Sequence, residues 1–265
     1  MTKVAAIQMV STPEIEENIE SAKRLIAEAA RQGAELVLLP EYWPSIGRSD
    51  KEKLAQAETP GSGPLQDFMS AMAKAHGIWL IGGTLSLVAP VKNKVLNTTL
   101  VYDPQGKAVS RYDKIHLFSF ASGKEAYDES TYICGGDDVV SFEAPFGRVG
   151  LTVCYDLRFP ELFRALGECA LIVVPAAFTY TTGKVHWEIL LKARAIENQC
   201  YILAAAQGGR HQTGRRTWGQ TILIDPWGEV KAELMEGEGV VLGEIEQEVL
   251  NTVREKLPAL KHKRL

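Results

Sequence analysis

The 265-residue sequence predicts an α/β protein built as a four-layer αββα sandwich with an internal pseudo-two-fold axis. Short runs rich in β-branched residues alternate with longer amphipathic runs, in the same order in both halves of the chain. Two motifs also recur: LLPE at Leu38–Glu41 matches VVPA at Val173–Ala176, and LVYDPQG at Leu100–Gly106 matches LIDPWG at Leu223–Gly228. Because no linker rich in Pro, Gly or Ser separates the halves, we expect a single domain over residues 1–265.

In the first half, two helices and four strands are expected. The helix over Glu14–Gln32 has apolar residues three and four positions apart, and Gly33 is a helix stop. The second helix covers Pro64–His76 and ends at Gly77. The strands are expected at Val4–Met9, Glu35–Leu39, Ile78–Ile81 and Asn97–Tyr102.

The second half repeats this scheme. Helices are expected over Pro160–Gly167, with Pro in a favoured place at the start, and over Val185–Asn198. Between the halves, His116–Val139 is rich in Gly, Ser and Asp and is expected to be irregular; so long a loop is usually functional or mobile. The strands are expected at Arg148–Cys154, Ala170–Val174, Tyr201–Ala205 and Gln220–Ile224.

Composition and charge exclude several classes of function. The chain is 46% hydrophobic and 23% charged, as in soluble globular proteins. Its 29 Lys and Arg against 33 Asp and Glu give a formal net charge of −4, whereas nucleic-acid binding needs a basic surface. No apolar run is long enough to cross a membrane, and Met1–Glu17 lacks the apolar core of a signal peptide. We expect a cytoplasmic protein whose partners include neither nucleic acid nor membrane.

A cysteine is the first candidate for a catalytic residue. The four cysteines lack CxxC spacing, and a reducing compartment disfavours a disulfide framework. Cys154 ends an apolar strand shortly before a helix start, an arrangement that aims backbone N–H groups at an anion and lowers the pKa of a thiol. Taken alone, Cys154 is better explained as a buried structural cysteine, and Cys134, Cys169 and Cys200 fit that explanation more closely still.

A carboxylate and a lysine are further candidates for catalytic residues. Glu41 follows an apolar strand, where α/β sheets place catalytic groups, although a helix N-cap or surface carboxylate is an equal alternative. Lys114 lies between apolar neighbours and can stabilise an oxyanion if it faces inward; a surface lysine is the alternative. His116 shares a strand face with Lys114, so a Cys–His enzyme using His116 or His186 stays open.

Other motifs are missing from the sequence. It contains no GxxxxGK[ST], GxGxxG, HExxH or GxSxG motif, and its His and Cys residues are too scattered for a zinc site. We therefore expect neither a cofactor nor a metal.

Together, these residues resemble the nitrilase superfamily of carbon–nitrogen hydrolases. The resemblance rests on LLPE ending in Glu41, RYDKIHLF around Lys114 and VGLTVCYDLRFPEL around Cys154, in this order along the chain. It covers essentially residues 1–265. Further matches are Ala177–Gly183, His186–Glu188, Ala193–Tyr201 and the DPWG turn.

The resemblance implies a Glu–Lys–Cys catalytic triad. Glu41 takes the proton of Cys154, the sulfur attacks an amide carbonyl, and Lys114 with the backbone N–H of Tyr155 holds the oxyanion. Glu41 then protonates the departing amine and activates water against the thioester. The family also implies a second glutamate after the Lys motif, which matches Glu129.

Glu125 competes with Glu129 for the role of second glutamate. The reason is that Phe120–Tyr127 lacks the Pro-Gly usual in relatives and is compatible with a shortened loop.

The motifs RFPEL, ARAIENQCY and AAAQGGRH resemble the Nit branch of the family, above all its deaminated glutathione amidases. Those enzymes cleave the amide between a 2-oxoglutaryl group and Cys-Gly. The alternatives are an omega-amidase acting on 2-oxoglutaramate or 2-oxosuccinamate, another amidase or nitrilase, an acyltransferase, and an inactive scaffold. A substrate with a 2-oxo carboxylate needs a cation or a polar cluster, for which the loop candidates are Thr181, Lys184, Arg210 and Arg215.

Two expectations concern neighbouring regions. Asp156 and Arg158 are predicted to form a structural ion pair beside the nucleophile. The resemblance also implies a homodimer or higher homo-oligomer, assembled through Pro160–Leu166 and Thr252–Leu265.

Overall fold

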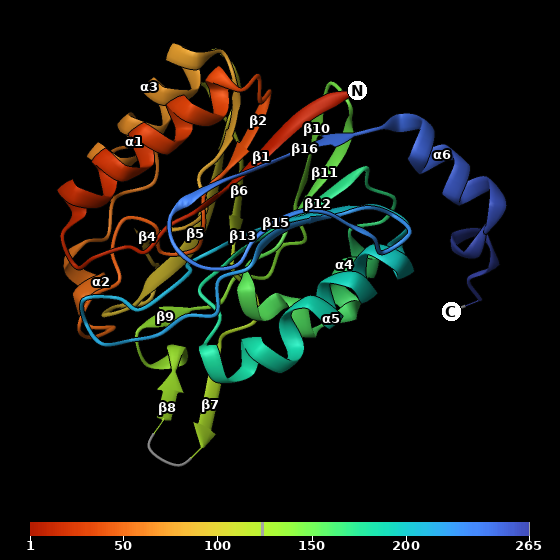
Figure 1. Cartoon of the computed structure of the whole chain (residues 1–265). Helices are drawn as coiled ribbons and strands as arrows, with labels where there is room; N and C mark the ends of the chain where they lie inside the picture. The colour runs from red at the N-terminus through yellow and green to blue at the C-terminus, as the bar shows by residue number, and fades with distance from the viewer. Residues whose placement is uncertain (123–124, 265) are drawn as a thin grey trace.

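Two β-sheets lie face to face, with helices on both outer sides (Figure 1). The computed structural model of the chain describes residues 1–122 and 125–264, without the side chains of Ser122 and Glu125. The first sheet contains, in spatial order, β16 (Gly239–Ile245), β1 (Thr2–Gln8), β2 (Leu36–Leu38), β3 (Trp79–Ile81), β5 (Val95–Tyr102) and β4 (Leu85–Val88), with β6 (Ala108–Asp113) and β9 (Ile133–Cys134) also paired to β5. The second contains β10 (Ser141–Ala144), β11 (Gly147–Leu151), β12 (Leu171–Ala176), β13 (Tyr201–Ala206), β14 (Thr221–Ile224) and β15 (Val230–Leu234).

The two sheets share one pairing pattern. Along β16-β1-β2-β3-β5-β6 the successive pairs are antiparallel, parallel, parallel, antiparallel and antiparallel. Along β10-β11-β12-β13-β14-β15 the pairs follow the same sequence of directions. The pseudo-two-fold predicted from the repeated motifs is confirmed, and it makes β2 the counterpart of β12 and β1 the counterpart of β11.

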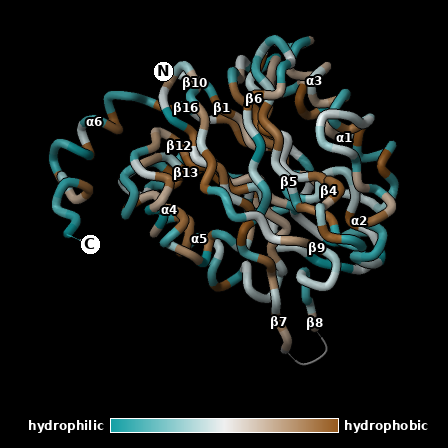
Figure 2. Tube along the Cα trace, turned by 180° about the vertical axis from the view of Figure 1, so that it is seen from behind, coloured by the Kyte–Doolittle hydropathy of each residue, from teal (hydrophilic) through white to brown (hydrophobic). Residues whose placement is uncertain are grey.

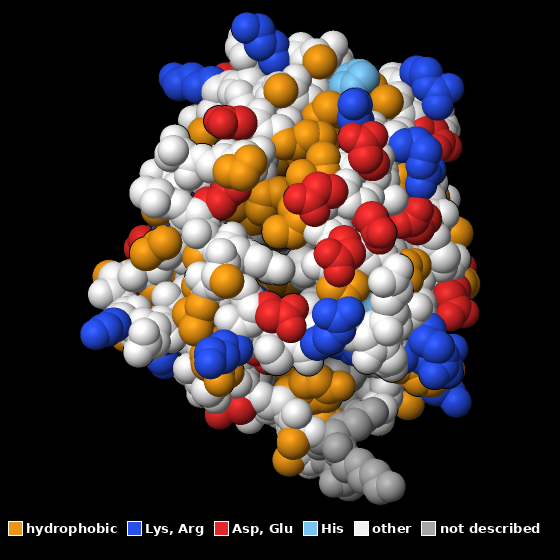
Figure 3. Space-filling view, turned by 90° about the vertical axis from the view of Figure 1, so that its left-hand side faces the viewer, with side chains coloured by type: hydrophobic (Ala, Val, Ile, Leu, Met, Phe, Trp, Pro, Cys, Tyr) orange, Lys and Arg blue, Asp and Glu red, His pale blue; other side chains and the backbone are white. Residues whose placement is uncertain are grey.

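Helices α1 (Ile15–Arg31) and α3 (Pro64–His76) cover the outer face of the first sheet. Their apolar stripes pack against it, as Leu25 and Met69 do against Ile7 and Val37. Helix α3 ends at Gly77, whose φ of 63° is the left-handed conformation that favours glycine. Figure 3 looks onto the side of the molecule where these helices lie and shows charges of both signs interspersed with hydrophobic groups.

Helices α4 (Pro160–Ala165) and α5 (Tyr180–Asn198) cover the outer face of the second sheet, through Phe163 and Trp187 among others. Between the sheets, Leu38 of the first half belongs to the same buried cluster as Leu203 and Ile222 of the second. Figure 2 shows the hydrophobic residues concentrated along the strands between the helical layers. Helices, sheet, sheet and helices give the four layers that the sequence predicts.

Two boundaries differ from expectation in ways that affect the site. The strand expected to reach Cys154 ends at Leu151, and Cys154 begins a short 3₁₀-helix, η2 (Cys154–Arg158). Helix α5 begins at Tyr180 rather than Val185, because the hydroxyl of Thr179 caps it by accepting from the N–H of Thr182.

The segment His116–Val139 was expected to be irregular, and this expectation was wrong in part. It contains the hairpin β7 (Ser119–Ser122) and β8 (Glu125–Asp128), which projects from the body, then η1 (Glu129–Thr131) and β9. Phe120 lies opposite Tyr127 in the hairpin, an aromatic pair of the kind that stabilises short antiparallel strands.

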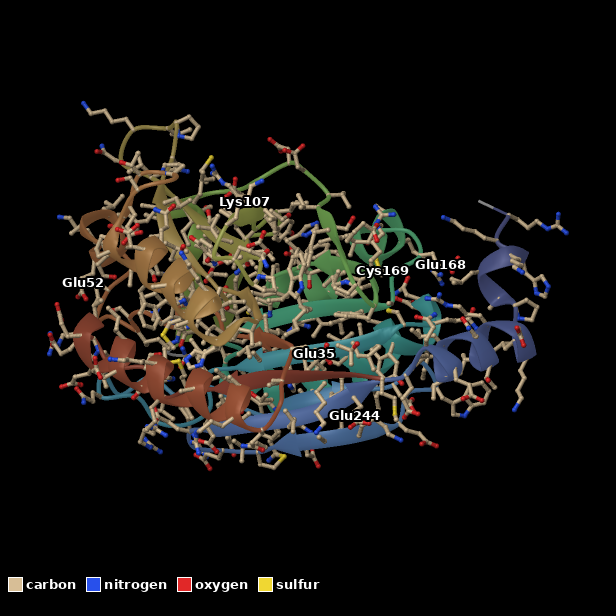
Figure 4. All side chains as sticks on the ribbon, turned by 90° about the horizontal axis from the view of Figure 1, so that it is seen from above. Glu35, Glu52, Lys107, Glu168, Cys169 and Glu244 are labelled. Carbon is tan, nitrogen blue, oxygen red and sulfur yellow. The ribbon has the colours of Figure 1, made fainter. Side chains whose placement is uncertain are left out.

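The chain ends on the opposite side of the body from α1. After β16, helix α6 (Gln247–Lys256) and η3 (Ala259–His262) extend outward (Figure 1). Arg254 fastens α6: its guanidinium lies 2.8 Å from Glu168 Oε1 and donates to the carbonyl of Cys169 at 2.5 Å. Figure 4 labels both residues on the side of the molecule that faces this helix.

The helix α2 (Glu52–Ala55) lies in the connection between β2 and α3. Across residues 1–122 and 125–264, no helix has the length and apolar character needed to traverse a bilayer.

Candidate active site

The three residues predicted to be catalytic all follow strand ends, and the fold brings them together. Glu41 follows β2, Lys114 follows β6 and Cys154 follows β11. Glu41 and Lys114 are each 1% exposed and Cys154 is 7% exposed. Residues up to 113 positions apart in the sequence therefore share one buried site.

Both oxygens of the Glu41 carboxylate are held by hydrogen bonds. Oε1 accepts from Lys114 Nζ at 3.0 Å and from Asn97 Nδ2 at 3.0 Å. Oε2 accepts from the backbone N–H of Ala177 at 2.8 Å. Because Ala177 follows β12, the carboxylate of the first half is oriented by a backbone donor of the second half.

Lys114 lies between two carboxylates. Its ammonium is 3.0 Å from Glu41 Oε1 and 2.8 Å from Glu129 Oε2. Burial alone would lower the pKa of Lys114, but the negative charges of Glu129 and Glu41 outweigh it and raise that pKa well above its usual value. Likewise burial would raise the pKa of Glu129, but the positive charges of Lys114 and Lys53 and the hydrogen bonds from Lys114 and Phe118 together outweigh burial and lower that pKa. Lys114 and Glu129 are therefore both charged at neutral pH.

Glu129 is also held by groups outside the triad. Its Oε2 accepts from the backbone N–H of Phe118 at 2.7 Å, and its Oε1 accepts from the hydroxyl of Tyr42 at 2.9 Å. The side chain of its competitor Glu125 lies outside the described residues.

Cys154 lies on a tight turn with a φ of +48°, a conformation that non-glycine residues adopt at an energetic cost. Asp156 holds this turn, since its Oδ2 accepts from the backbone N–H of Val153 at 2.8 Å and from the hydroxyl of Tyr112 at 2.6 Å. The backbone N–H of Tyr155 is in the first turn of η2, where no partner exists within the helix.

The expectation of a thiol with a lowered pKa was wrong. Burial, and then the negative charge and hydrogen bonding of Glu41, raise the pKa of Cys154 well above its usual value, and the opposing charge of Lys114 is not sufficient to reverse this. The sequence argument considered only the N–H groups of the turn and not the carboxylate opposite. The resting residue is therefore a thiol.

The predicted ion pair between Asp156 and Arg158 was also wrong. Asp156 Oδ1 accepts instead from the backbone N–H of His116 at 3.0 Å and contacts its Nδ1 at 2.7 Å. Arg158 points away from it, over the rings of Tyr155 and Phe178, with its carbon Cζ 5.7 and 5.4 Å from their centroids. In the 3₁₀ turn, Asp156 faces back toward the start of the turn whereas Arg158 leaves from its end.

The two histidines weighed as partners of Cys154 have other contacts. His116 contacts Asp156, and its ring stacks on Phe159 with centroids 3.6 Å apart. His186 Nδ1 lies 3.4 Å from the guanidinium of Arg158. These contacts favour Glu41 over a histidine as the proton acceptor.

A pocket with an empty volume of about 310 Å³ opens at the thiol. Cys154, Glu41 and Glu129 line it, together with aromatic and polar side chains and one arginine. These other lining residues are Tyr42, Phe118, Tyr155, Ala177, Phe178, Thr179, Thr182 and Arg215.

Of the four residues predicted to bind the substrate carboxylate, the fold brings Arg215 to this pocket. Thr181 is not among the lining residues, although its neighbour Thr182 is. Lys184 lines a separate groove along α5, and Arg210 is exposed on its loop. Over the part of the chain that the structure describes, no group of three or more His, Cys, Asp or Glu side chains is arranged to hold a metal ion.

Residues 3–255 match the family described as carbon-nitrogen hydrolase. The chain belongs to this family. The deaminated glutathione amidase of Synechocystis sp. is 41% identical to it over 265 residues, which cover 98% of this chain and 97% of that protein. The predicted family is confirmed, and this carbon–nitrogen hydrolase acts on amide bonds.

Solved structures agree with this assignment. The Caenorhabditis elegans NitFhit protein matches 99% of this chain with a TM-score of 0.91 and 38% identity, and this chain spans 65% of that one. Saccharomyces cerevisiae Nit3, a member of branch 10 of the nitrilase superfamily, matches 100% of this chain and 97% of its own with a TM-score of 0.90 and 29% identity.

Sequence reasoning missed three residues of the candidate site. Asn97 is a polar residue in the buried strand β5, and its Nδ2 also donates to the hydroxyl of Tyr42 at 2.9 Å. A polar side chain within an apolar strand was the available signal for Asn97. Tyr42 directly follows Glu41, whereas the contribution of Ala177 is its backbone N–H, which leaves no signal in the sequence.

Proposed function

We propose that the protein is a thiol amidase that hydrolyses deaminated glutathione, a small 2-oxo-acid amide, through a thioester on Cys154. The observation that carries the proposal is the ammonium of Lys114 held between Glu41 and Glu129, the two carboxylates that line the pocket together with the thiol of Cys154. The printed name of the Synechocystis relative, at 41% identity over nearly the whole chain, supports the choice of substrate.

In the first step, Cys154 transfers its proton to Glu41 as the sulfur attacks the amide carbonyl carbon. A C–S bond forms, and the electrons of the C=O double bond move to oxygen. An ammonium has three N–H donors; the two carboxylates use two of them, so Lys114 has one left for the oxyanion. The N–H of Tyr155 supplies a second donor. Each such donor contributes about 3 kcal/mol to the stabilisation of the transition state.

The second half of the reaction reverses the role of Glu41. The C–N bond breaks, Glu41 protonates the departing amine, and the acyl group stays on Cys154 as a thioester. Glu41 then takes a proton from water as the water attacks the thioester carbon, and the thiol leaves with its proton restored. The raised pKa of Cys154 suits this cycle, because the proton moves to Glu41 only when the sulfur attacks.

The 2-oxo carboxylate of the acyl group needs a cation near the thiol. Arg158 faces the rings of Tyr155 and Phe178, both of which line the pocket, and no ion pair with a carboxylate occupies it within the described residues. We assign the acyl carboxylate to this wall of the pocket.

Trapping the acyl-enzyme tests the proposal. Rapid acid quench with deaminated glutathione, followed by peptide mass spectrometry, is expected to find the 2-oxoglutaryl group on the peptide of Cys154. Cys154→Ala is expected to lose the adduct and about 10⁴-fold or more of kcat. Cys134→Ser is the control, because Cys134 is a half-buried free thiol outside the pocket. Turnover retained in Cys154→Ala contradicts the proposal.

The substrate is tested separately. A kcat/KM for deaminated glutathione above that for 2-oxoglutaramate supports the proposal. The reverse order favours the omega-amidase alternative.

We also propose a homodimer. Leu162, Phe163 and Leu166 of the expected interface are buried in the core, so α4 offers little apolar surface to a partner. On α5, in contrast, Val185 and Ile189 are 61% and 68% exposed, four positions apart on one helix face. This face of α5 is the better interface. Leu265, at the end of the second expected segment, lies outside the described residues.

Light scattering in solution tests the dimer. Ile189→Glu is expected to halve the measured mass, whereas Lys23→Glu on the exposed side of α1 leaves it unchanged. A wild-type monomer contradicts the proposal. A cytoplasmic location is proposed as well, because all four cysteines are free, as is usual in a reducing compartment.

A further inference from the structure

A second chamber adjoins the catalytic pocket. It has an empty volume of about 290 Å³ and is lined mainly by the segment from Tyr42 to Gln56, including Ser45, Ser49 and Lys53. Two residues, Tyr42 and Arg215, line both spaces and therefore form the wall between them. A substrate with two arms needs space on both sides of the thiol, and this second space continues from the catalytic pocket at Tyr42 and Arg215.

Arg215 is an unpaired cation in this wall. Its Nε is buried and has no hydrogen-bond partner, and no carboxylate among the described residues forms an ion pair with it. Its only aromatic contact in the described chain is with Tyr127, whose ring centroid lies 5.6 Å from Cζ. The other cation of the chamber, Lys53, is already paired with Asp50 at 2.6 Å. A buried donor without a partner carries an energetic cost, which an anionic ligand removes.

The chemistry of the reaction indicates which end of the substrate reaches Arg215. In the proposed function Glu41 protonates the leaving nitrogen, so this nitrogen lies on the Glu41 side of the thiol. The chain continues from Glu41 directly into Tyr42 and hence into the wall shared with Arg215. The part of the lining formed by Tyr155 and Phe178, whose rings Arg158 faces, remains for the acyl group.

We propose that Arg215 binds the carboxylate of the leaving amine at the wall that the pocket shares with the chamber behind Tyr42, and that this contact gives the enzyme its preference for leaving groups with a carboxylate. This inference rests on the proposed function and specifies the substrate class of the same site. It makes Arg215 a specificity residue for the departing half of the substrate.

Three substrates with a common 2-oxoglutaryl group test this assignment. They are deaminated glutathione, its analogue with a terminal glycinamide in place of the carboxylate, and 2-oxoglutaramate, which releases ammonia. In Arg215→Met, kcat/KM for deaminated glutathione is expected to fall about 10- to 100-fold, mainly through KM. The loss is expected to be several-fold smaller for the two substrates whose leaving group has no carboxylate. The wild-type preference for deaminated glutathione over its glycinamide analogue therefore disappears.

Arg216→Met is the matched control. Arg216 is the next residue, but its guanidinium lies 3.7 Å from the ring centroid of Tyr180 and does not line either space. Its kinetics are expected to match wild type on all three substrates. Arg215→Lys keeps the charge and is expected to restore part of the preference, which separates charge recognition from a loss of loop structure.

The outcomes separate this inference from the proposed function. Equal losses on all three substrates in Arg215→Met, or no loss on any of them, overturn the assignment of Arg215 while the wild-type rates still support the amidase. Wild-type enzyme that does not hydrolyse deaminated glutathione overturns the proposed function itself. Inhibition by free Cys-Gly gives an independent readout, and it is expected to weaken in Arg215→Met.

Discussion

The two halves of the sandwich share strand order and pairing but contribute different groups to the pocket. Strand β2 is followed by Glu41, which supplies a carboxylate, whereas its counterpart β12 is followed by Ala177, which supplies a backbone N–H to that carboxylate at 2.8 Å. Equivalent strand ends thus meet across the sheet interface as donor and acceptor. The repeated fold determines the positions, and the residues at those positions divide the chemistry between the halves.

The strands β1 and β11 show the same division. The chain after β11 carries Cys154, whereas the chain after β1 carries Ser11, which connects the halves. The N–H of Ser11 donates to Gln207 Oε1 at 3.0 Å, and Gln207 Nε2 donates to Ser11 Oγ at 2.8 Å. One strand end is therefore used for the proposed chemistry and its counterpart for assembly of the two halves.

Removal of the Lys114 ammonium is expected to cause the largest losses of stability and of kcat. Lys114→Met leaves two buried carboxylates without their cation, which destabilises the fold by about 3–5 kcal/mol. The loss of the proposed oxyanion donor is expected to lower kcat by about 10²- to 10³-fold. Urea unfolding and steady-state kinetics measure the two effects.

Lys107→Met is the control for this variant, since Lys107 is exposed near the turn after β5, where Figure 4 labels it. It is expected to change stability by no more than about 0.5 kcal/mol. Wild-type kcat in Lys114→Met would contradict the oxyanion role.

A smaller effect on stability is expected from the protonation of His211 in the second half, which contacts Ser11 of the first half. Its Nδ1 lies 2.9 Å from the carbonyl oxygen of Ser11, and burial lowers the pKa of His211 to about 4 from 6.5. Between these values the unfolded chain binds a proton that the folded chain does not, so stability falls as the pH falls through this window. The expected loss between pH 7 and pH 5 is about 2 kcal/mol.

Urea unfolding at pH 7 and pH 5 measures this loss. In His211→Gln the loss is expected to disappear, whereas His262→Gln, at an exposed position, retains it. An unchanged pH dependence in His211→Gln shows that the contact between the halves is not what titrates.

The smallest effects on stability are expected from substitutions in the two matching turns, which begin at Asp103 and Asp225. Asp103 Oδ1 accepts from the N–H groups of Gln105 and Lys107 at 3.0 and 2.9 Å, and Asp225 Oδ1 accepts from those of Trp227 and Glu229, both at 2.9 Å. Asp103→Ala and Asp225→Ala are each expected to lower stability by about 1 kcal/mol and to leave kcat unchanged.

The two turn variants are compared by urea unfolding. The Asn variants keep the acceptor oxygen and are expected to recover most of the loss. A loss at one turn several times that at the other shows that the two turns are not energetically equivalent.

The sequence was sufficient for the central strands of both sheets and for the helices α1, α3, α4 and α5, whereas the edge strands β4, β10, β15 and β16 were not predicted. The apolar spacing of α1 and the left-handed Gly77 after α3 are local signals, and both elements lie where these signals indicate. The predicted start of helix α5, at Val185, was five residues too late, because the capping hydroxyl of Thr179 was not recognised next to the apolar pattern. Cys154 was assigned to a strand, because a positive φ at a residue other than glycine leaves no mark in a sequence.

The site was harder to predict, because its contacts join distant parts of the chain. Glu41, Lys114 and Cys154 were each ambiguous alone, and only their resemblance to a family in a fixed order connected them. The raised pKa of Cys154 depends on the nearby carboxylate of Glu41, 113 positions earlier in the chain, which no local pattern contains. Asn97 was read as part of an ordinary strand because the orientation of its amide is a property of the tertiary structure.

The pairing of β1 with β16 has a consequence for how this protein is made. Thr2 lies opposite Ile245, so β1 can pair with β2 early but gains its other partner, β16, only after all the strands between them have been translated. Until then one edge of the nascent sheet keeps its N–H and C=O groups open to other chains. Translation that stalls before residue 239 therefore leaves an intermediate with an unpaired, aggregation-prone sheet edge to which chaperones can bind.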